Sequence, residues 1–490
     1  MSLMLSVSGC RGVVGETLTP EVAARFAGSF ASWLRERAGG KPTTVVVGRD
    51  GRAGGDVVRL AALAGIAGAG CRVVDVGVAM TPTVAVMTDS YARRAQGEVV
   101  AGMVLTASHN PQQWNGLKCL LAEGGLHGSA ACAPPAVFAN QIIERFRAGG
   151  AGAVAWDRVG ALVQDGSGVD EHVQRVLTAL EESGLCEEPQ TLGDGLRVAV
   201  DCVNASGSRG APQLLEALGC AEILPLNVSE SGLFPHPPEP TLENLSMAGG
   251  LADAVREAGA DVGFAQDPDA DRLALIDEQG AYVGEEYTLA LGAMALLSTP
   301  EGKGAALVTN LSTSRMLDDV AARFGARVLR TAVGEANVVE SMKRERALAG
   351  GEGNGGVIWP RVAYVRDSLS AMALTLWLMS AQGGGRGARR RLSDLAASIP
   401  SYAIVKRKVD LRRREDATDA IEKISAAHQD QHVDRQDGAW VDFRQGPLAG
   451  RAWLHVRASN TEPIMRLIAE APTAEAANRV LDEAARVIGA

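Results

Sequence analysis

Short apolar runs alternate with amphipathic stretches along most of this chain, in an order that repeats. Residues 42–78 pass from the apolar run TTVVVGRD, through a helical stretch after Gly55, to a second apolar run, RVVDVGV. A similar order begins at Leu196 with LRVAVDC and at Gly304 with GAALVTN. Apolar runs of this length joined by helices are typical of right-handed parallel strand-helix-strand units. The pattern therefore predicts an α/β protein with three related units and mixed sheets.

Helices and turn residues indicate where these units meet. A helix from Val169 to about Glu182 has one apolar face and stops before Gly184, which suits a bridge between domains. Turn chemistry at Thr299-Pro300 and a glycine- and arginine-rich stretch at 383–391, interpreted as a flexible linker, mark two further boundaries. The predicted domains are residues 1–165, 166–298, 299–388 and 389–490. The last is smaller and differently composed, and it ends in an amphipathic helix after Pro472.

Length, charge and cysteine content narrow the class of protein. A chain of 490 residues is too long for one hydrophobic core, which agrees with several domains. Its net charge of -10 disfavours binding to nucleic acid. The N-terminus lacks the basic start of a secretory signal, and the apolar runs are too short to span a membrane. Seven cysteines without C-x-x-C spacing are typical of reduced thiols, so we expect a cytoplasmic protein that acts on small molecules.

The first loop with candidate chemistry is Thr106-Ala-Ser-His-Asn-Pro, directly after the apolar run 99–105. Open α/β sheets bind their ligands at this end of a strand. Taken alone, Ser108 is an ordinary turn residue. His109 beside it and Lys118 shortly after it bring an imidazole and an ammonium near one hydroxyl, which suits phosphoryl transfer.

The second loop, Asp267-Pro-Asp-Ala-Asp-Arg272, follows the apolar run DVGFAQ. Its carboxylates at alternate positions are the hard oxygen ligands that magnesium prefers, so Asp267, Asp269 and Asp271 are the predicted metal ligands. An EF-hand is excluded because Arg272 stands where that loop needs glycine and because LALID after it is typical of a strand. A solvated acidic turn is the alternative if the motif is considered alone.

Two further loops carry polar groups that would suit sugar hydroxyls in one case and a phosphate in the other. The run Gly350-Gly-Glu-Gly-Asn-Gly-Gly356 lets backbone approach a ligand and leaves Glu352 and Asn354 as its functional side chains, although a glycine-rich hairpin turn is an equal alternative. The fourth loop follows the run AWLHV and carries donors that could surround a phosphate, although its polar residues could also cap a turn. Its donors are Arg457, Ser459, Asn460 and Thr461.

Together the four loops resemble those of the α-D-phosphohexomutase superfamily, over essentially the whole chain and in the same order. The resemblance implies four domains around a central cleft, three of them related α/β units and the last smaller and differently built. It also implies that Ser108 is a phosphoserine primed by a sugar bisphosphate, and that Mg²⁺ is held there by the three aspartates. The implied ligand set is Ser108, Asp267, Asp269 and Asp271.

The resemblance further assigns roles to the remaining residues. Arg272 would touch the transferred phosphoryl group, while Arg457, Ser459, Asn460 and Thr461 would hold the other phosphate of the substrate. Arg11, in SGCRGVVG, and Lys118 match positions close to the phosphoserine, and Lys118 is provisionally the general acid or base. Phosphorylated Ser108 would donate its phosphoryl group to the sugar, giving a bisphosphate that turns around and returns the other one.

Departures from the commonest pattern bear on the sugar. Many members have a serine where Asn354 stands, a histidine where Gly356 stands and a basic residue close to Ala336. The forms GEGNGG and VGEANV look more like a phosphoglucosamine mutase-related branch, in which Glu335 or Glu352 could meet a substrate ammonium. Glucosamine phosphate is therefore the expected substrate, with phosphomannomutase or phosphoglucomutase activity as the alternative.

Two interpretations of another class are a magnesium-dependent sugar phosphatase and an inactive binding homologue. A phosphatase built on an aspartyl nucleophile does not need the serine loop, and an inactive homologue does not need the intact set of motifs. The expected partner is a small phosphosugar, bound by a monomer or a homodimer.

Overall fold

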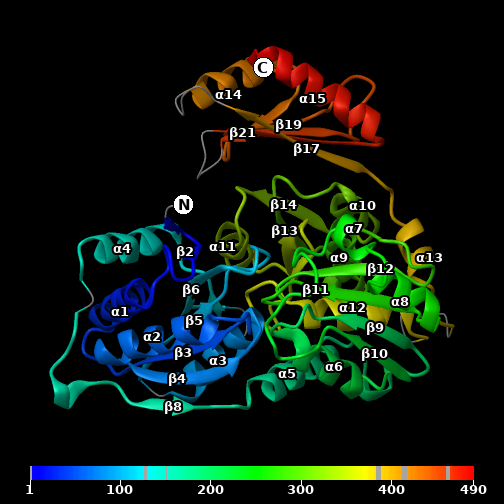
Figure 1. Ribbon diagram of the computed structural model, residues 1–490. Helices are drawn as coiled ribbons and strands as arrows, with labels where there is room; N and C mark the ends of the chain where they lie inside the picture. Colours follow the sequence, from blue (N-terminus) through cyan, green and yellow to red (C-terminus); the bar gives the residue numbers. More distant parts are fainter. Residues whose placement is uncertain are drawn as a thin grey trace.

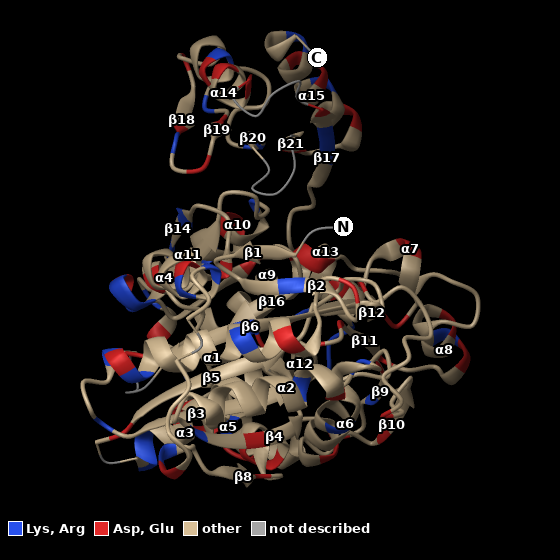
Figure 2. Ribbon diagram, turned by 60° about the vertical axis from the view of Figure 1, so that its left-hand side comes forward, with Lys and Arg blue, Asp and Glu red and all other residues tan. Residues whose placement is uncertain are grey.

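The computed structural model describes residues 3–95, 97–125, 130–150, 152–381, 388–410, 416–458 and 464–489. Three α/β units form a broad body, and a fourth unit stands above it (Figure 1). Figure 2, turned by 60°, shows the same separation, with one extended segment rising from the body into β17 (Ala403–Asp410). In the described part of the chain, no helix is long and apolar enough to cross a membrane.

The first unit is built on a sheet with the strand order β1-β2-β6-β5-β3-β4-β8, in which β7 pairs with β6. Strand β3 lies parallel to β4 and β5, and β6 runs antiparallel to β5. The strands are β1 (Met4–Ser6), β2 (Gly9–Val13), β3 (Thr43–Arg49), β4 (Arg72–Val78), β5 (Val99–Leu105), β6 (Trp114–Ala122), β7 (Ala131–Cys132) and β8 (Leu162–Gln164). The helices are α1 (Pro20–Arg37), α2 (Gly55–Gly68), α3 (Thr81–Arg94) and α4 (Ala136–Arg147), followed by the short 3₁₀ turn η1 (Trp156–Arg158).

The second and third units repeat the central part of this sheet. Their strand orders are β10-β9-β11-β12 and β14-β13-β15-β16, and in each the first three strands are parallel and the fourth antiparallel. The order β4-β3-β5-β6 of the first unit has the same directions. The three related α/β units with mixed sheets that the sequence predicts are thus confirmed.

In both of these units, helices alternate with the strands and cover the sheet. The strands are β9 (Arg197–Asp201), β10 (Glu222–Leu226), β11 (Val262–Gln266), β12 (Leu273–Asp277), β13 (Ala306–Asn310), β14 (Arg327–Thr331), β15 (Ala349–Glu352) and β16 (Gly356–Ile358). The helices are α5 (Gly168–Glu182), α6 (Gly207–Ala217), α7 (Leu242–Leu245), α8 (Leu251–Ala258), α9 (Glu285–Leu297), α10 (Met316–Arg323), α11 (Glu335–Glu345), α12 (Ser368–Met379) and α13 (Leu392–Ala397), with 3₁₀ turns η2 (Pro189–Thr191) and η3 (Pro300–Gly302).

The C-terminal unit is an antiparallel sheet with the order β17-β21-β20-β19-β18, covered by two helices. Its further elements are α14 (Asp416–Ala427), β18 (His432–Asp434), β19 (Ala439–Asp442), β20 (Trp453–Ala458), β21 (Ile464–Ala471) and α15 (Ala474–Ile488). Helix α15 begins where the Thr473 hydroxyl accepts a hydrogen bond from the Ala476 N–H, and it ends at Gly489 in the left-handed conformation. The α+β architecture and the closing helix are as predicted.

One apolar core joins the first three units. It extends from Val46 of β3 through α5 and α9 to α12 and Ile399. All residues of α12 are buried, so this helix has no solvent-facing stripe and lies inside the body. The C-terminal unit has a core of its own around Ile424, Leu454 and Leu481. The first three units therefore share one core, and the fourth unit has a main core of its own.

The predicted connections between units are found in part. Helix α5 spans Gly168–Glu182, close to the predicted bridge. Helix α9, which ends just before the boundary predicted at 298/299, packs on α10 and α12 of the third unit. Most of the predicted linker 383–391 lies outside the described residues, but Arg389 donates a hydrogen bond of 2.6 Å to the carbonyl of Gly195. The exact boundaries stay predictions.

Candidate active site

Ser108 lies on a tight turn just past the end of β5. Its φ of 50° is unusual for a serine, and the residue is 2% exposed. The turn is held locally because Thr106 Oγ1 accepts a hydrogen bond of 2.8 Å from the Ser108 N–H. The Ser108 hydroxyl donates to Asp267 Oδ2 at 2.9 Å. The strand end thus presents one buried hydroxyl to the aspartate loop of the second unit.

The turn at Ser108 is held by a buried ion pair between Arg52 and Asp50, which was not selected from the sequence. Arg52 is 1% exposed, and its Nε lies 2.8 Å from Asp50 Oδ2. Its guanidinium donates to the carbonyl oxygens of Ser108 at 2.6 Å and of Trp114 at 2.5 Å. Asp50 also accepts a hydrogen bond of 2.7 Å from Thr106 Oγ1. The available signal was the charged pair in GRDGR, directly after the apolar part of β3, which by itself indicates only the end of a strand.

Asp267, Asp269 and Asp271 come together on the turn between β11 and β12. One carboxylate oxygen from each lies within 4.8 Å of the others, and all three residues are buried. The turn is tight because Ala270 has a φ of 52° and because Asp267 Oδ1 accepts the N–H groups of Asp271 and Arg272, each at 3.2 Å. The three carboxylates that the sequence selects are therefore one cluster, directly beside Ser108.

The donor set of this cluster fits a divalent cation. Within the described part of the chain, Asp269 Oδ1 and Asp271 Oδ1 are buried without a hydrogen-bond partner. Burial and the repulsion from Asp269 and Asp271 raise the pKa of Asp267 well above the usual range. Buried carboxylates normally have their oxygens satisfied, so this excess of negative charge is what a hard cation with oxygen ligands would balance.

Lys118 on β6 reaches the same cluster. Its Nζ lies 2.7 Å from Asp269 Oδ2 and 3.7 Å from Asp271 Oδ2. Thr81 Oγ1, at the start of α3, donates to the same Asp269 oxygen at 2.7 Å. Burial opposes ionisation of Asp269, but Lys118 and Thr81 outweigh it and hold the pKa of this carboxyl below its usual range.

His109, Arg11 and Arg272 surround the Ser108 hydroxyl and the aspartates. His109 Nδ1 lies 3.3 Å from Ser108 Oγ. Burial, with a smaller contribution from Arg272 and Arg11, lowers the pKa of His109 to about 3, so the ring is neutral at neutral pH. Arg272 Nε lies 3.8 Å from Asp271 Oδ1, and its guanidinium is 3.8 Å from Glu239. Burial lowers the pKa of Arg11, whose Nε is buried without a hydrogen-bond partner among the described residues.

The glycine-rich loop is the hairpin between β15 and β16. Glu352, at the end of β15, is 5% exposed and accepts hydrogen bonds from Asn310 Nδ2 at 2.8 Å and Arg366 at 2.6 Å. Asn354 Nδ2 lies 3.4 Å from Glu352, while its Oδ1 is buried with no partner in the part of the chain that the structure describes. Glu335, at the start of α11, lies 3.0 Å from Arg366 Nε. The hairpin and Glu335 thus share a single cation that the sequence analysis did not select.

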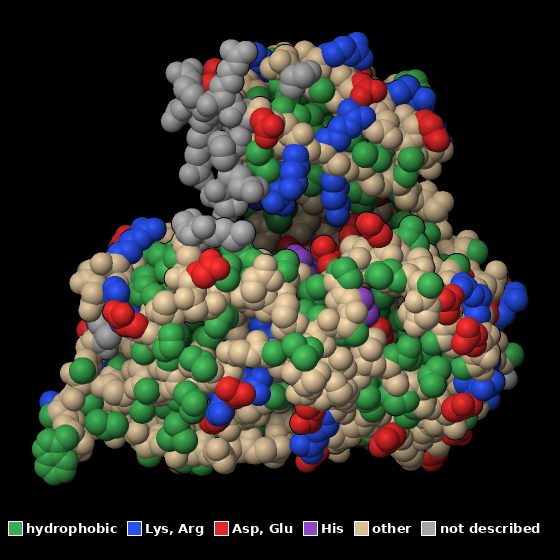
Figure 3. Space-filling view, viewed as in Figure 1, with side chains coloured by type: hydrophobic (Ala, Val, Ile, Leu, Met, Phe, Trp, Pro, Cys, Tyr) green, Lys and Arg blue, Asp and Glu red, His purple; other side chains and the backbone are tan. Residues whose placement is uncertain are grey.

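The fourth loop is described only at its start. Arg457, near the end of β20, lies 3.0 Å from Asp437 Oδ2, a carboxylate that the sequence analysis did not pair with it. Ser459, Asn460 and Thr461 lie outside the described residues. Figure 3 shows a hollow between the C-terminal unit and the body, with Lys and Arg side chains above and Asp, Glu and His side chains on its floor.

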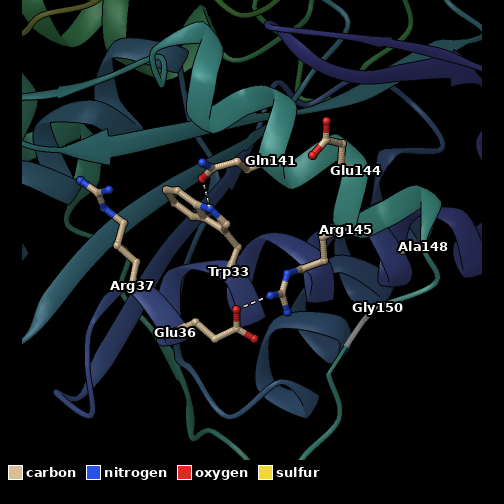
Figure 4. Close-up of a pocket in the computed structure, with 8 residues that line it drawn as sticks. All are labelled: Trp33, Glu36, Arg37, Gln141, Glu144, Arg145, Ala148 and Gly150. Atoms are coloured by element: carbon tan, nitrogen blue, oxygen red, sulfur yellow. Dashed lines mark hydrogen bonds and ion pairs between the residues drawn. The ribbon is translucent and has the colours of Figure 1, made fainter.

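A separate hollow of about 680 Å³ lies on the outer face of the first unit, between α1 and α4 (Figure 4). Four of its polar side chains form two pairs: Trp33 Nε1 donates to Gln141 Oε1 at 2.9 Å, and Arg145 pairs with Glu36. Among the described residues that line it, none is a catalytic side chain predicted from the sequence. The site with chemistry is the one around Ser108.

Comparison with known proteins decides the family. Models described as phosphoglucomutase/phosphomannomutase match the chain in order: domain I at residues 3–133, domain II at 176–280, domain III at 284–402 and the C-terminal domain at 405–487. A protein of Methanopyrus kandleri described as a probable phosphoglucosamine mutase is 35% identical over 487 residues, 99% of this chain and 97% of the relative. The chain belongs to the α-D-phosphohexomutase superfamily. The protein is therefore a phosphohexomutase, an intramolecular phosphotransferase acting on small phosphosugars.

Other relatives of this phosphohexomutase have related names. A phosphoglucomutase/phosphomannomutase of Thermococcus kodakarensis is 34% identical, with 98% of this chain and 97% of the relative covered. Among solved structures, a phosphoglucomutase/phosphomannomutase family protein from Burkholderia thailandensis has a TM-score of 0.79 at 26% identity, covering 99% of this chain and 98% of that chain. Parafusin, a phosphoglucomutase of Paramecium, has a TM-score of 0.76 at 16% identity, with 99% and 94% covered, and shares the fold.

Proposed function

We propose that this protein is a phosphoglucosamine mutase, which interconverts glucosamine 6-phosphate and glucosamine 1-phosphate through phosphorylated Ser108. The observation that carries the proposal is the buried Ser108 hydroxyl, which donates to Asp267 in a cluster of three aspartates. A hydroxyl in that position can accept and return a phosphoryl group while the neighbouring charges stay fixed, which is how positioning lowers a phosphoryl-transfer barrier.

Each neighbouring group has a part in this reaction. Asp267, Asp269 and Asp271, together with the phosphorylated Ser108 side chain, would hold Mg²⁺, which when bound neutralises charge on the phosphoryl group. Arg272 and Arg11, whose charges act on His109 beside Ser108, would contact the phosphoryl oxygens through their guanidinium groups. Arg457 would leave Asp437 to bind the other phosphate, with Ser459, Asn460 and Thr461 as further donors.

Phosphoryl transfer exchanges one phosphorus–oxygen bond for another. The bond between phosphorus and Ser108 Oγ breaks as phosphorus bonds to the free sugar hydroxyl, and the hydroxyl proton passes to a base. Neutral His109 is one candidate, and Lys118 is the other provided that its amine is deprotonated when the sugar binds, since both lie beside the reacting groups. The bisphosphorylated sugar then turns around, and its other phosphate returns to Ser108 by the same steps in reverse.

The negative charge around the glycine-rich hairpin, residues 350–356, favours a cationic sugar. This hairpin is called the sugar loop below. Glu335 and Glu352 share Arg366, which also pairs with Asp271, so the loop keeps an excess of negative charge. Burial raises the pKa of Glu335, and the charge of Arg366 opposes this shift without cancelling it. The ammonium of glucosamine would supply a balancing positive charge. The Methanopyrus kandleri relative is described as a probable phosphoglucosamine mutase. The Thermococcus kodakarensis relative makes phosphoglucomutase or phosphomannomutase activity the second candidate.

Conversion of glucosamine, mannose and glucose 1-phosphates to the 6-phosphates, compared in a coupled assay with Mg²⁺, tests the sugar. We expect the highest kcat/KM for glucosamine 1-phosphate, and faster turnover of mannose 1-phosphate would contradict that assignment.

The phosphoserine is tested by intact-mass analysis after incubation with a hexose bisphosphate. One added phosphate should appear on the wild-type chain, and Ser108→Ala should lose it together with turnover. The control is Ser229→Ala, an exposed serine whose hydroxyl bonds only with that of Ser231 in the described structure. Full turnover by Ser108→Ala would overturn the mechanism.

The cellular compartment and the oligomeric state of the enzyme are also proposals. None of the seven cysteines forms a disulfide within the described structure, which supports a reducing compartment such as the cytoplasm. We propose that the enzyme works there as a monomer or a homodimer, with the phosphosugar as its partner.

A further inference from the structure

The metal loop is the segment Asp267–Arg272. Among the ion pairs of the described residues, Arg366 is the one side chain that pairs with both the metal loop and the sugar loop. Its guanidinium lies 2.5 Å from Asp271 Oδ2 and 2.6 Å from Glu352 Oε2, and its Nε lies 3.0 Å from Glu335 Oε2. The Arg366 side chain is 11% exposed, and the three carboxylates range from 1% to 17%. A planar guanidinium can direct several donors at once, which an ammonium cannot do with the same geometry.

The backbone around Arg366 is fixed to both loops. The next residue, Asp367, donates its N–H to the carbonyl of Val357 at 2.8 Å, in the strand after the sugar loop. Ser368 Oγ then donates to the carbonyl of Ala270, in the middle of the metal loop, at 2.6 Å. The two loops also meet directly, because the Leu273 N–H donates to Gly355 O at 2.9 Å. Arg366 therefore projects from a rigid junction.

Gly356 makes room for the arginine. A Cβ at this position would lie 2.1 Å from Arg366 Cδ and 2.7 Å from Cγ, far inside van der Waals contact. The φ of Gly356 is not in the left-handed region, so the backbone conformation does not require glycine. The lack of space for a side chain does. Gly356 and Arg366 thus form one unit: the absence of a side chain at the first position lets the second lie across the hairpin.

We propose that Arg366 is a positioning residue for the mutase reaction. By pairing with both, it holds the sugar-binding carboxylate of Glu352 at a fixed position relative to the metal-binding carboxylate of Asp271. Glu352 has one oxygen on Asn310 and the other on Arg366, so the plane of the carboxylate is set from both sides. Phosphoryl transfer requires the sugar hydroxyl to reach Ser108 in line, and the sugar takes its orientation from this carboxylate. A shift of about 1 Å in such an arrangement costs on the order of 100-fold in rate. This inference rests on the proposed function, in which Glu352 binds the sugar.

The proposal predicts that turnover and metal affinity change in different ways. Arg366→Met should lower kcat/KM about 100-fold, with the larger part in kcat, because the sugar hydroxyl is no longer held in line with Ser108. Mg²⁺ binding, measured by calorimetry without substrate, should stay equal or tighten up to about tenfold, because a cation beside Asp271 is gone. Arg366→Lys keeps the charge but loses the planar fork, so it should recover only part of kcat/KM.

A double-mutant cycle tests the unit formed by the two residues. Gly356→Ala should lower kcat/KM at least about tenfold in the wild-type background by displacing the arginine, and should have little further effect in Arg366→Ala. Arg361→Ala is the matched control, since Arg361 pairs with Glu182 and Glu301 away from both loops and should leave kcat/KM unchanged. Circular dichroism and gel filtration verify folding of each variant.

The measurements use whichever hexose 1-phosphate the wild-type enzyme converts fastest, so the proposal does not depend on the identity of the sugar. It is overturned if Arg366→Met keeps kcat/KM within about threefold of wild type, if Mg²⁺ affinity falls in parallel with turnover, or if the effects of Gly356→Ala and Arg366→Ala are additive. If Arg366→Met does not fold, Gly356→Ala and Arg366→Lys decide by the same two readouts.

Discussion

At the residue scale, the second unit carries an ion pair, between His236 and Asp201, that raises the pKa of the histidine. His236, after β10, has Nε2 3.0 Å from Asp201 Oδ2 and Nδ1 2.9 Å from the carbonyl of Pro237. Burial alone would lower the pKa of His236, but the hydrogen bond and charge of Asp201 outweigh it and raise the pKa above 6.5. The folded protein therefore holds this proton more tightly than the unfolded chain does.

The pH dependence of stability follows from that direction. The pair contributes its full stabilisation below pH 6.5, the unfolded value, and loses it as the pH rises through the higher folded pKa. Urea unfolding of wild type and His236→Gln at several pH values on both sides of 6.5 should show a smaller loss on raising the pH in the variant. His432→Gln, at an exposed histidine of β18, is the control and should follow wild type. Equal pH profiles for His236→Gln and wild type would contradict the assignment.

Single residues also show where sequence reasoning succeeds and where it stops. Ser108 and Asp267 each lie in a dense local motif at a strand end, which is why the sequence selects them, and the structure brings them within 2.9 Å. Arg366 was missed because its three partners come from loops up to 95 positions away in sequence. Asp50 and Arg52 were missed for the same reason, since the turn that they hold begins more than fifty residues later. Local composition marks reacting groups, whereas supporting groups are defined by tertiary contacts.

At the element scale, the start of α12 connects the first and third units. Asp367 caps the helix by accepting the N–H groups of Leu369 at 3.0 Å and Ser370 at 3.1 Å. It also lies 3.2 Å from Nε2 of His172, a fully buried residue of α5, whose Nδ1 is 2.9 Å from Thr83 of α3. Burial favours the neutral form, but His172 and the hydrogen bond from Ser370 lower the pKa of Asp367. One carboxylate thus orients three helices.

Removal of this carboxylate should destabilise the body without touching the reacting groups. Asp367→Ala loses a helix cap, worth about 1 kcal/mol, and leaves a buried His172 nitrogen unpaired, worth about 1 to 3 kcal/mol. Urea unfolding should therefore show a loss of about 2 to 4 kcal/mol. Asp367→Asn keeps the cap and an acceptor for His172, so it should lose less than half as much. Equal losses in the two variants would indicate that negative charge, and not hydrogen bonding, is the important property.

The elements themselves followed from the hydrophobic pattern more closely than the site did. Strand β5 spans Val99–Leu105 and α5 spans Gly168–Glu182, both as predicted to within one residue. The glycine-rich run could not be assigned from pattern alone, because its glycines allow a hairpin or a loop equally. Pairing of β15 with β16 depends on the neighbouring strand β13, and no local periodicity encodes that contact.

At the scale of the whole molecule, the C-terminal unit contacts the third unit along a seam that has both charged and apolar groups. Arg315, before α10, pairs with Asp442 of β19, and its N–H donates to Glu470 Oε1 at 3.0 Å. Apolar contacts support the seam, from Leu311 to Trp440, Trp453 and Ile468. Burial raises the pKa of Glu470, which is fully buried. The seam determines how the C-terminal unit faces the body across the hollow in Figure 3.

Loosening this seam should weaken substrate binding more than chemistry. Arg315→Ala removes a charged hydrogen bond worth about 1.5 to 3 kcal/mol. Asp442 then keeps Arg444 as its cationic partner. KM for the sugar phosphate should rise severalfold while kcat changes less than about twofold, and small-angle scattering should show a larger radius of gyration. Arg435→Ala, which breaks an exposed pair with Glu422 inside the C-terminal unit, is the control. An unchanged radius with a raised KM would assign the effect to the site and not to the seam.

The continuous core of the body also affects how the chain is made. Helix α3 of the first unit packs on α5, and α5 and α9 pack in turn on α12, which the ribosome produces long after α3 and α5. Until α12 emerges, the faces of α5 and α9 that it covers expose apolar surface of the kind that chaperones bind. The C-terminal unit carries its own core and has no such delay. Truncation before α12 should therefore yield an aggregating fragment, whereas truncation after α13 should leave a body able to close.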